Sequence, residues 1–98
     1  MSWRFGLLQF DWDPEKSQQN EKKHGVSFNE AATVFSDYLS TTFPDPDHSI
    51  GEERFITIGM SEFGRLFVVV HADEADTIRI ISARNATRHE KKYYEKKK

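Results

Sequence analysis

The 98-residue sequence contains no cysteine. This absence excludes disulfide bonds, thiolate nucleophiles and cysteine-based zinc clusters. The sequence also lacks any run near the roughly 20 apolar residues that a transmembrane helix requires. No basic N-terminal segment leads into a long apolar stretch. We therefore expect neither secretion nor membrane insertion, and a cytoplasmic protein is the simplest interpretation.

The motifs of several enzyme classes are missing as well. There is no Gly-rich phosphate-binding loop, no GxSxG nucleophile elbow and no HExxH zinc motif. The four histidines, His24, His48, His71 and His89, are widely spaced and define no metal site. No metal or other cofactor is expected.

Hydrophobic residues make up 37% of the chain and aromatic residues 13%, which fits a single domain over residues 1–98 with a modest core. The net charge of −2 conceals an uneven distribution. Residues 1–83 carry seven Lys and Arg against fourteen Asp and Glu, whereas residues 84–98 carry seven against two. A Lys-rich end can simply keep a protein soluble. Clustered cations can also bind nucleic acid, because they release counterions condensed on phosphates.

The second half of the chain predicts a short antiparallel meander. Three segments rich in Phe, Ile and Val are the expected strands: Glu53–Met60, Arg65–Ala72 and Asp76–Ala83. Their connections, Ser61-Glu62-Phe63-Gly64 and Asp73-Glu74-Ala75, are short, which favours hairpins. Because side chains alternate along a strand, one face of the second strand holds Leu66, Val68 and Val70, and the other holds Arg65, Phe67, Val69 and His71. In the third strand Ile78 and Ile80 lie opposite Arg79 and Ile81.

A polar helix is predicted near the N-terminus. Asp13 is a good N-cap, Pro14 suits the first helical position, and Gly25 suits the residue after the helix. The helix has too few apolar residues to be anchored by burial. We therefore expect it to lie at the protein surface, with Trp12 and Val26 holding its two ends.

Two further helices are predicted from capping boxes. Ser27 and Glu30 begin a helix that runs from Phe28 to about Ser36 and turns an apolar face to the core. Thr87 and Glu90 begin a basic C-terminal helix. Short strands are expected at Gln9–Trp12, as an edge of the sheet, and at Asp37–Thr42, followed by a loop over Phe43–Gly51. The predicted fold is α+β: two N-terminal helices and a C-terminal helix on a small antiparallel sheet.

Charged residues gather at four places that could carry chemistry. These are Lys22, Lys23 and His24; Glu52, Glu53 and Arg54; His71, Arg79 and Arg84; and Arg84, Arg88, His89, Lys91, Lys92, Tyr93 and Tyr94. The first three have plainer interpretations, namely helix C-terminal charge complementation, solvated surface charge and an internal ion pair for an Arg within a strand. In the fourth, cations alternate with aromatic residues that can stack on bases.

A series of short motifs runs in order along most of the chain. It begins with Phe10-Asp11-Trp12-Asp13-Pro14-Glu15-Lys16, Asn20, Lys23-His24-Gly25-Val26-Ser27-Phe28 and Glu30-Ala31-Ala32-Thr33-Val34-Phe35. It continues with Asp47-His48-Ser49, Gly51-Glu52-Glu53-Arg54, Gly59, Val68-Val69-Val70, Arg79-Ile80-Ile81-Ser82-Ala83-Arg84, Ala86, Glu90 and Tyr94. Together these motifs resemble the BrnT family of bacterial toxins over about residues 10–94, leaving residues 1–9 and the basic tail, residues 95–98, outside.

The resemblance implies a RelE-like fold and a ribonuclease that arrests translation. It also implies a partner, a BrnA-like antitoxin with a ribbon-helix-helix-like DNA-binding character, which neutralises the toxin in a hetero-oligomer and helps to repress the operon. Family members often carry an Arg in the hairpin that is Asp73-Glu74-Ala75 here, so we expect weaker phosphate contact from that hairpin.

RNA cleavage without a metal requires a base for the ribose 2′-OH, stabilisation of charge on the phosphate oxygens, and an acid for the leaving 5′-oxygen. Given the resemblance, we expect Arg54, Arg79 and Arg84 to stabilise charge, because a guanidinium fork matches phosphate oxygens. The candidates for proton transfer are His71, His24 and Glu53.

The residues expected to contact RNA are Lys23, Arg65, Arg88, Lys91, Lys92 and Tyr94. A second hypothesis, from a different class of protein, is a non-enzymatic module whose basic C-terminal helix binds a protein or a nucleic acid.

Overall fold

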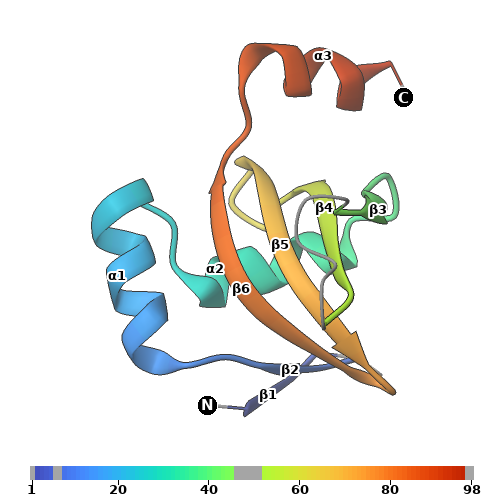
Figure 1. Ribbon diagram of the computed structural model, residues 1–98. Helices are drawn as coiled ribbons and strands as arrows, with labels where there is room; N and C mark the ends of the chain where they lie inside the picture. Colours follow the sequence, from blue (N-terminus) through green and yellow to red (C-terminus); the bar gives the residue numbers. More distant parts are fainter. Residues whose placement is uncertain (1, 6–7, 46–51, 97–98) are drawn as a thin grey trace.

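The computed structural model of the protein describes residues 2–5, 8–45 and 52–96. Its elements are β1 (Ser2–Phe5), β2 (Leu8–Asp11), α1 (Pro14–His24), α2 (Phe28–Ala32), the 3₁₀ helix η1 (Thr33–Ser36), β3 (Thr41–Pro44), β4 (Arg54–Met60), β5 (Leu66–Glu74), β6 (Thr77–Asn85) and α3 (Arg88–Glu95). Figure 1 shows α1 and α2 beside and behind the sheet and α3 above its upper end. The prediction of an α+β fold is confirmed. No helix of the described ranges is long and apolar enough to cross a membrane.

The sheet has six strands in the order β1-β2-β6-β5-β4-β3. The meander of β4, β5 and β6 is antiparallel, as the short connections predict. The prediction of a wholly antiparallel sheet was wrong, because β2 pairs with β6 in parallel. A tight turn cannot join parallel neighbours, and here the chain from β2 to β6 runs through α1, α2, η1 and the strands β3, β4 and β5. Since β1 folds back on β2 and forms the edge, the predicted N-terminal strand lies one position inside the sheet.

The connection between β5 and β6 is tighter than the predicted hairpin. β5 extends to Glu74, so that only Ala75 and Asp76 turn the chain. Ala75 has a φ of 53°, the left-handed conformation that two-residue hairpin turns use. The predicted hairpin residue Asp73 therefore belongs to β5.

The strand after η1 starts later than predicted because Asp37 holds a turn. Its Oδ1 accepts a hydrogen bond from the Leu39 amide (3.0 Å), and its Oδ2 accepts one from the Met60 amide (2.8 Å). Asp side chains commonly stabilise turns in this way. The strand β3 therefore occupies Thr41–Pro44, and the remainder of the predicted loop, residues 46–51, lies outside the described residues.

The polar helix α1 is capped as the sequence predicts, with Asp13 Oδ1 accepting from the Glu15 amide and Gly25 at a φ of 71°. Its anchor, however, includes a polar residue. Asn20 is buried, donates to the carbonyls of Val26 and Ala83, both at 2.8 Å, and accepts from the Ala83 amide at 3.2 Å. A single carboxamide thus joins α1, the connection after it and β6.

The second predicted helix divides into two. Ser27 Oγ accepts from the Glu30 amide at its start, and Phe28 and Ala31 are buried as expected. After Ala32 the α-helix gives way to η1. The capping box of α3 is complete: Thr87 Oγ1 accepts from the Glu90 amide, and Glu90 Oε1 accepts from the Thr87 amide.

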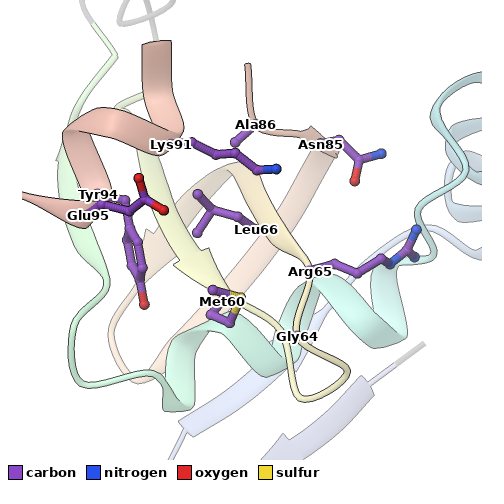
Figure 2. Close-up of a pocket in the computed structure, with 9 residues that line it drawn as sticks. All are labelled: Met60, Gly64, Arg65, Leu66, Asn85, Ala86, Lys91, Tyr94 and Glu95. Atoms are coloured by element: carbon purple, nitrogen blue, oxygen red, sulfur yellow. The ribbon is translucent and has the colours of Figure 1, made fainter. Parts of the chain in front are cut away.

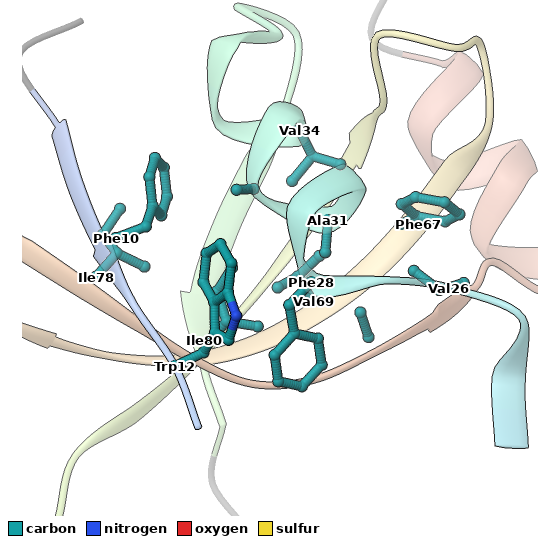
Figure 3. Packing of buried hydrophobic residues seen from close by; sticks show 12 residues of the cluster. Phe10, Trp12, Val26, Phe28, Ala31, Val34, Phe67, Val69, Ile78 and Ile80 are labelled. Carbon is teal, nitrogen blue, oxygen red and sulfur yellow. The ribbon is translucent and has the colours of Figure 1, made fainter. Parts of the chain in front are cut away.

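The sheet separates two apolar cores. The larger one, shown in Figure 3, packs α2, η1 and the residues that flank α1, Trp12 and Val26, onto one side of the sheet, which we call the helix face. It includes Phe10, Trp12, Val26, Phe28, Ala31, Val34, Phe67, Val69, Ile78 and Ile80. The smaller core, Ile58, Leu66, Val68 and Tyr94 with half-buried neighbours, lies on the other side, which we call the α3 face.

A β-bulge changes the alternation of side chains along β6. Val70 pairs with Ser82, but the next residue of β5 pairs with Ile80, so Ile81 is an extra residue. Ile80 and Ala83, three positions apart, both belong to the helix-face core. Strict alternation would put Arg79 and Arg84 on opposite faces. The bulge brings both onto the α3 face.

Candidate functional site

Two arginines flank the middle strand of the meander on the α3 face. Arg54 of β4 and Arg79 of β6 are both paired in register with Ala72 of β5. Their backbones are therefore two strand spacings apart, about 10 Å. Glu52 Oε1 forms an ion pair with the Arg79 guanidinium and lies 3.7 Å from Arg54 Nε. One carboxylate thus links the two cations.

The electrostatics of this group favour anions. The hydrogen bond from Arg79 is the main cause that lowers the pKa of Glu52, so this carboxylate is ionised at neutral pH. Arg54 Nε is buried and donates to no described residue. A guanidinium has five N–H donors, so each arginine retains donors for a further anion. We call Glu52, Arg54 and Arg79 the arginine pair site.

Arg84 lies farther along β6 on the same face. It forms a bidentate ion pair with Glu90 of α3, with N–O distances of 2.8 and 2.9 Å. This pair, together with the Thr87 backbone contact, lowers the pKa of Glu90 to about 2. The pair ties α3 to the sheet and leaves the edge of Arg84 partly exposed.

His71 does not join the arginines. It lies on the helix face and is 1% exposed. Its Nδ1 lies 2.7 Å from Asp73 Oδ1 and its Nε2 lies 2.7 Å from Thr57 Oγ1. Burial lowers its pKa, against the opposing effect of Asp73. Both ring nitrogens are therefore occupied within the fold, and the ring packs edge-on against Phe35 at 4.9 Å.

A second group of predicted residues meets at the end of the sheet near the C-terminus of α1. Arg65 Nη2 donates to the Gly25 carbonyl at 3.2 Å, and the guanidinium pairs with Glu30. Asn85 donates to the His24 carbonyl at 3.4 Å. These contacts bring Arg65 and the end of β6 against the last turn of α1, which carries Lys23 and His24.

The remaining predicted residues are dispersed. Glu53, Arg88, Lys91 and Lys92 are exposed, the last three on α3. Tyr94 is buried, and its hydroxyl donates to Asp37 Oδ2 at 2.5 Å, so its ring holds α3 in place instead of offering a free stacking surface. Within the described ranges no three His, Asp or Glu side chains gather in a way that could hold a metal ion.

Glu52 is the site residue that the sequence interpretation missed. The sequence places it in the group Glu52, Glu53 and Arg54, but the candidates for proton transfer are His71, His24 and, from this group, Glu53. Neither residue lies in a strand, so alternation gives no preference between the two side chains. Glu52 could have been predicted from Arg79, because an Arg in the middle of a strand needs an acidic partner.

Residues 12–90 match the family model described as a ribonuclease toxin, BrnT, of a type II toxin–antitoxin system. The fold is thus that of a toxin of a type II system, a class that works with an antitoxin partner. The chain is a member of the BrnT family of ribonuclease toxins.

The fold is similar to the crystal structure, at 1.1 Å resolution, of the Brucella abortus ribonuclease toxin BrnT. The TM-score is 0.62 and the sequence identity 24%, and the match covers 81% of this chain and 96% of the Brucella chain. At this level of identity the likeness concerns the fold. No curated protein sequence matches the chain.

Proposed function

We propose that this protein is a RelE-like endoribonuclease that cleaves RNA without a metal ion and so inhibits translation in the cytoplasm. The observation that carries the proposal is the position of Glu52 between Arg54 and Arg79 on the α3 face. A carboxylate next to two guanidinium groups combines a proton acceptor with donors for phosphate oxygens, which are two of the three requirements of the reaction.

In the proposed reaction the scissile phosphate binds to Arg54 and Arg79. The phosphate oxygens then accept hydrogen bonds from the guanidinium groups that bind Glu52 in the free protein. Glu52 loses the partners that lower its pKa, so its basicity rises when substrate binds. Glu52 then removes the proton of the ribose 2′-OH, and the 2′-oxygen attacks phosphorus to form a 2′,3′-cyclic phosphate. The bond to the 5′-oxygen breaks, and this oxygen takes a proton from water. The two guanidinium groups stabilise the charge that develops on the phosphate oxygens.

The proposal changes the assignment of proton transfer. His71 is buried on the helix face, and His24 lies at the opposite end of β6, beside Asn85. Glu53 is exposed next to the site. We therefore propose Glu52 as the base instead of these three residues. Arg84 and the exposed cations Arg88, Lys91 and Lys92 would attract the RNA backbone.

We further propose that the partner is a BrnA-like antitoxin with a ribbon-helix-helix-like fold. The family membership supports a protein partner. An antitoxin that covers the α3 face would have to mask Arg54, Arg79 and Arg84, which calls for a complementary acidic or apolar surface.

Cleavage of a labelled RNA by the purified protein, in the presence of EDTA, tests the proposal. Glu52→Gln and Arg79→Ala should each lower the rate by on the order of 10²–10³, whereas the matched control Glu53→Gln should retain most of it. Full activity in Glu52→Gln would refute its role as base. Loss of activity in EDTA, restored by a divalent metal, would refute the metal-independent reaction.

One observation favours the second hypothesis, a non-enzymatic binding module. The arginines of the β4–β6 region are all paired with carboxylates: Arg54 and Arg79 with Glu52, Arg65 with Glu30, and Arg84 with Glu90. If Glu52 only neutralises its neighbours, Glu52→Gln should bind RNA more tightly than the wild type and cleave nothing. The wild type separates the two hypotheses: an enzyme cleaves RNA and loses this activity in Glu52→Gln, whereas a binding module binds RNA without cleaving it in either form.

A further inference from the structure

An apolar groove lies between α3 and the β3–β4 edge of the sheet, on the α3 face. It has a volume of about 370 Å³. Two strands and one helix line it, through Phe43 of β3, Ile58 of β4, and His89, Glu90 and Tyr93 of α3. We call it the α3 groove.

Two contacts fix α3 relative to the sheet and so hold the groove in shape. Tyr94, which extends from α3 toward the sheet in Figure 2, donates its hydroxyl to Asp37 Oδ2 at 2.5 Å. Arg84 of β6 binds both carboxylate oxygens of Glu90. A partner therefore meets a groove that is already formed, and binding does not have to order the helix first.

The floor and one wall of the α3 groove are apolar. Ile58 is buried in the smaller core, and Phe43 packs against that core as a half-buried residue. Tyr93 of the wall is 43% exposed, and tyrosines in such positions are typical anchors of protein interfaces. Glu90, the carboxylate among the described lining residues, is neutralised by Arg84. Apolar contact is thus the main interaction that the groove offers.

Cations border this apolar surface. Arg88 and Lys92 each precede a lining residue of α3, His89 and Tyr93, by one position, and both cations are exposed. Within the described ranges neither of them forms an ion pair. The surface therefore complements a segment that has an apolar stripe with acidic residues beside it.

We propose that the α3 groove docks an acidic amphipathic helix of the antitoxin. The family supplies this partner, because a toxin of a type II system works with an antitoxin. An amphipathic helix lays its apolar stripe into a groove of this kind, and its acidic residues would meet Arg88 and Lys92. An added β-strand is a poorer occupant. The edge strand β3 has only four residues and ends at Pro44, which has no N–H to donate.

The proposal rests on the proposed function for one point, which is how docking stops the toxin. Arg54, Ile56 and Ile58 lie on the same face of β4, so Arg54 is about 13 Å from Ile58 along the strand. Roughly nine helical residues span that distance. A helix that leaves the groove along β4 would reach the arginine pair site and keep RNA away from Arg54 and Arg79.

The test measures binding of the purified toxin to the antitoxin encoded with it, in the absence of RNA. Tyr93→Asp puts a charge into the apolar groove and should raise the dissociation constant at least about tenfold. Tyr38→Asp is the matched control, because Tyr38 is 93% exposed and lies outside the groove. It should change the dissociation constant less than about twofold. Thermal unfolding confirms that both variants fold.

A second pair of variants tests the charge complementarity. Lys92→Glu should slow association with the antitoxin about threefold or more, and high salt should reduce the effect. Lys16→Glu changes an exposed cation on α1 by the same charge and should slow association much less. Both lysines are exposed, so these substitutions remove no packing from the core.

Two other occupants would give different results. If RNA fills the groove, Tyr93→Asp should weaken RNA binding and leave antitoxin binding as in the wild type. If a second copy of this chain fills it, Tyr93→Asp should convert a dimer of the toxin alone into a monomer and leave antitoxin binding unchanged. Either result, or no binding of the antitoxin to the wild type, would overturn the proposal.

The docking site and the proposed ribonuclease can fail separately. If Tyr93→Asp and Lys92→Glu weaken antitoxin binding but the wild type cleaves no RNA, the reaction is refuted and the docking site remains. If the wild type cleaves RNA but both variants bind the antitoxin as it does, the docking site is refuted and the reaction remains.

Discussion

The Nε2 atom of His71 lies 2.7 Å from Oγ1 of Thr57, and both side chains are buried. The contact is part of a chain that crosses three strands. Thr57 Oγ1 lies 2.6 Å from Thr42 Oγ1 on β3, and His71 Nδ1 lies 2.7 Å from Asp73 Oδ1 on β5. Because an ionised carboxylate only accepts, Nδ1 carries the proton of the neutral ring and Nε2 accepts from the Thr57 hydroxyl.

Replacing Thr57 by Val should therefore destabilise the fold. The change keeps the shape of the side chain but leaves His71 Nε2 buried without a donor, which costs about 1–3 kcal/mol. Urea unfolding measures the effect. Thr57→Ser is the control, since it keeps the hydroxyl and should retain the hydrogen bond. A Val variant as stable as the wild type would show that Nε2 finds another donor.

The buried imidazole also predicts a pH dependence of stability. The folded protein holds the pKa of His71 below its ordinary 6.5, so below about pH 6.5 the unfolded chain binds a proton that the native state does not. The free energy of unfolding should fall as the pH is lowered from about 6.5 toward the native pKa, and His71 should contribute no slope above that window.

Urea unfolding between about pH 5 and 7.5 checks this prediction, in a range above the titration of Glu90, whose pKa is about 2. His71→Gln should flatten the slope. Asp73→Asn should steepen it, because Asp73 is the group that opposes the lowering of the His71 pKa. An unchanged slope in His71→Gln would assign the dependence to other groups.

Asn20 should be among the most sensitive positions of the polar helix α1. Replacing it by Ala removes the partners of the Val26 and Ala83 carbonyls and of the Ala83 amide. Each buried backbone group left without a partner costs about 1–3 kcal/mol. Thermal or urea unfolding should show a large loss for Asn20→Ala and almost none for Gln19→Ala, an exposed neighbour. Similar stabilities for the two variants would contradict the anchoring role.

Gly59 allows β4 to pass close to η1. A Cβ atom at this position would lie 3.0 Å from Ser40 Cβ and 3.1 Å from both Val34 Cβ and the Val34 carbonyl oxygen. Gly59→Ala should therefore destabilise the protein by about 1–3 kcal/mol through overpacking. Gly64 is a useful contrast, because its φ is 79° and a Cβ there would meet no atom within 4 Å. Gly64→Asn should be tolerated better, since Asn adopts left-handed conformations readily.

Local sequence signals predicted the helix caps and the hairpins. Asp13, Ser27 and Thr87 act as N-caps because each bonds to an amide two or three residues away, a contact within reach of the local chain. The alternation of apolar residues likewise predicted the faces of β5, since no bulge interrupts that strand. The ordered motifs identified the family, which the match over residues 12–90 confirms.

The candidate site depended on contacts between distant parts of the chain. Whether Glu52 or Glu53 meets Arg79, 27 positions away from Glu52, is set by how the segment before β4 approaches β6. His71 is buried because η1 and β4 pack against it. The residues next to His71 in the sequence do not predict these contacts.

The sequence by itself thus determined where the elements begin and which residues are apolar, because these are properties of short segments. Only the tertiary structure decided which cations share a face. The extra residue Ile81 shifts the alternation of β6 by one position, and Arg79 and Arg84 meet the same side of the sheet for that reason. A bulge arises from the pairing of two strands, so the sequence of one strand does not reveal it.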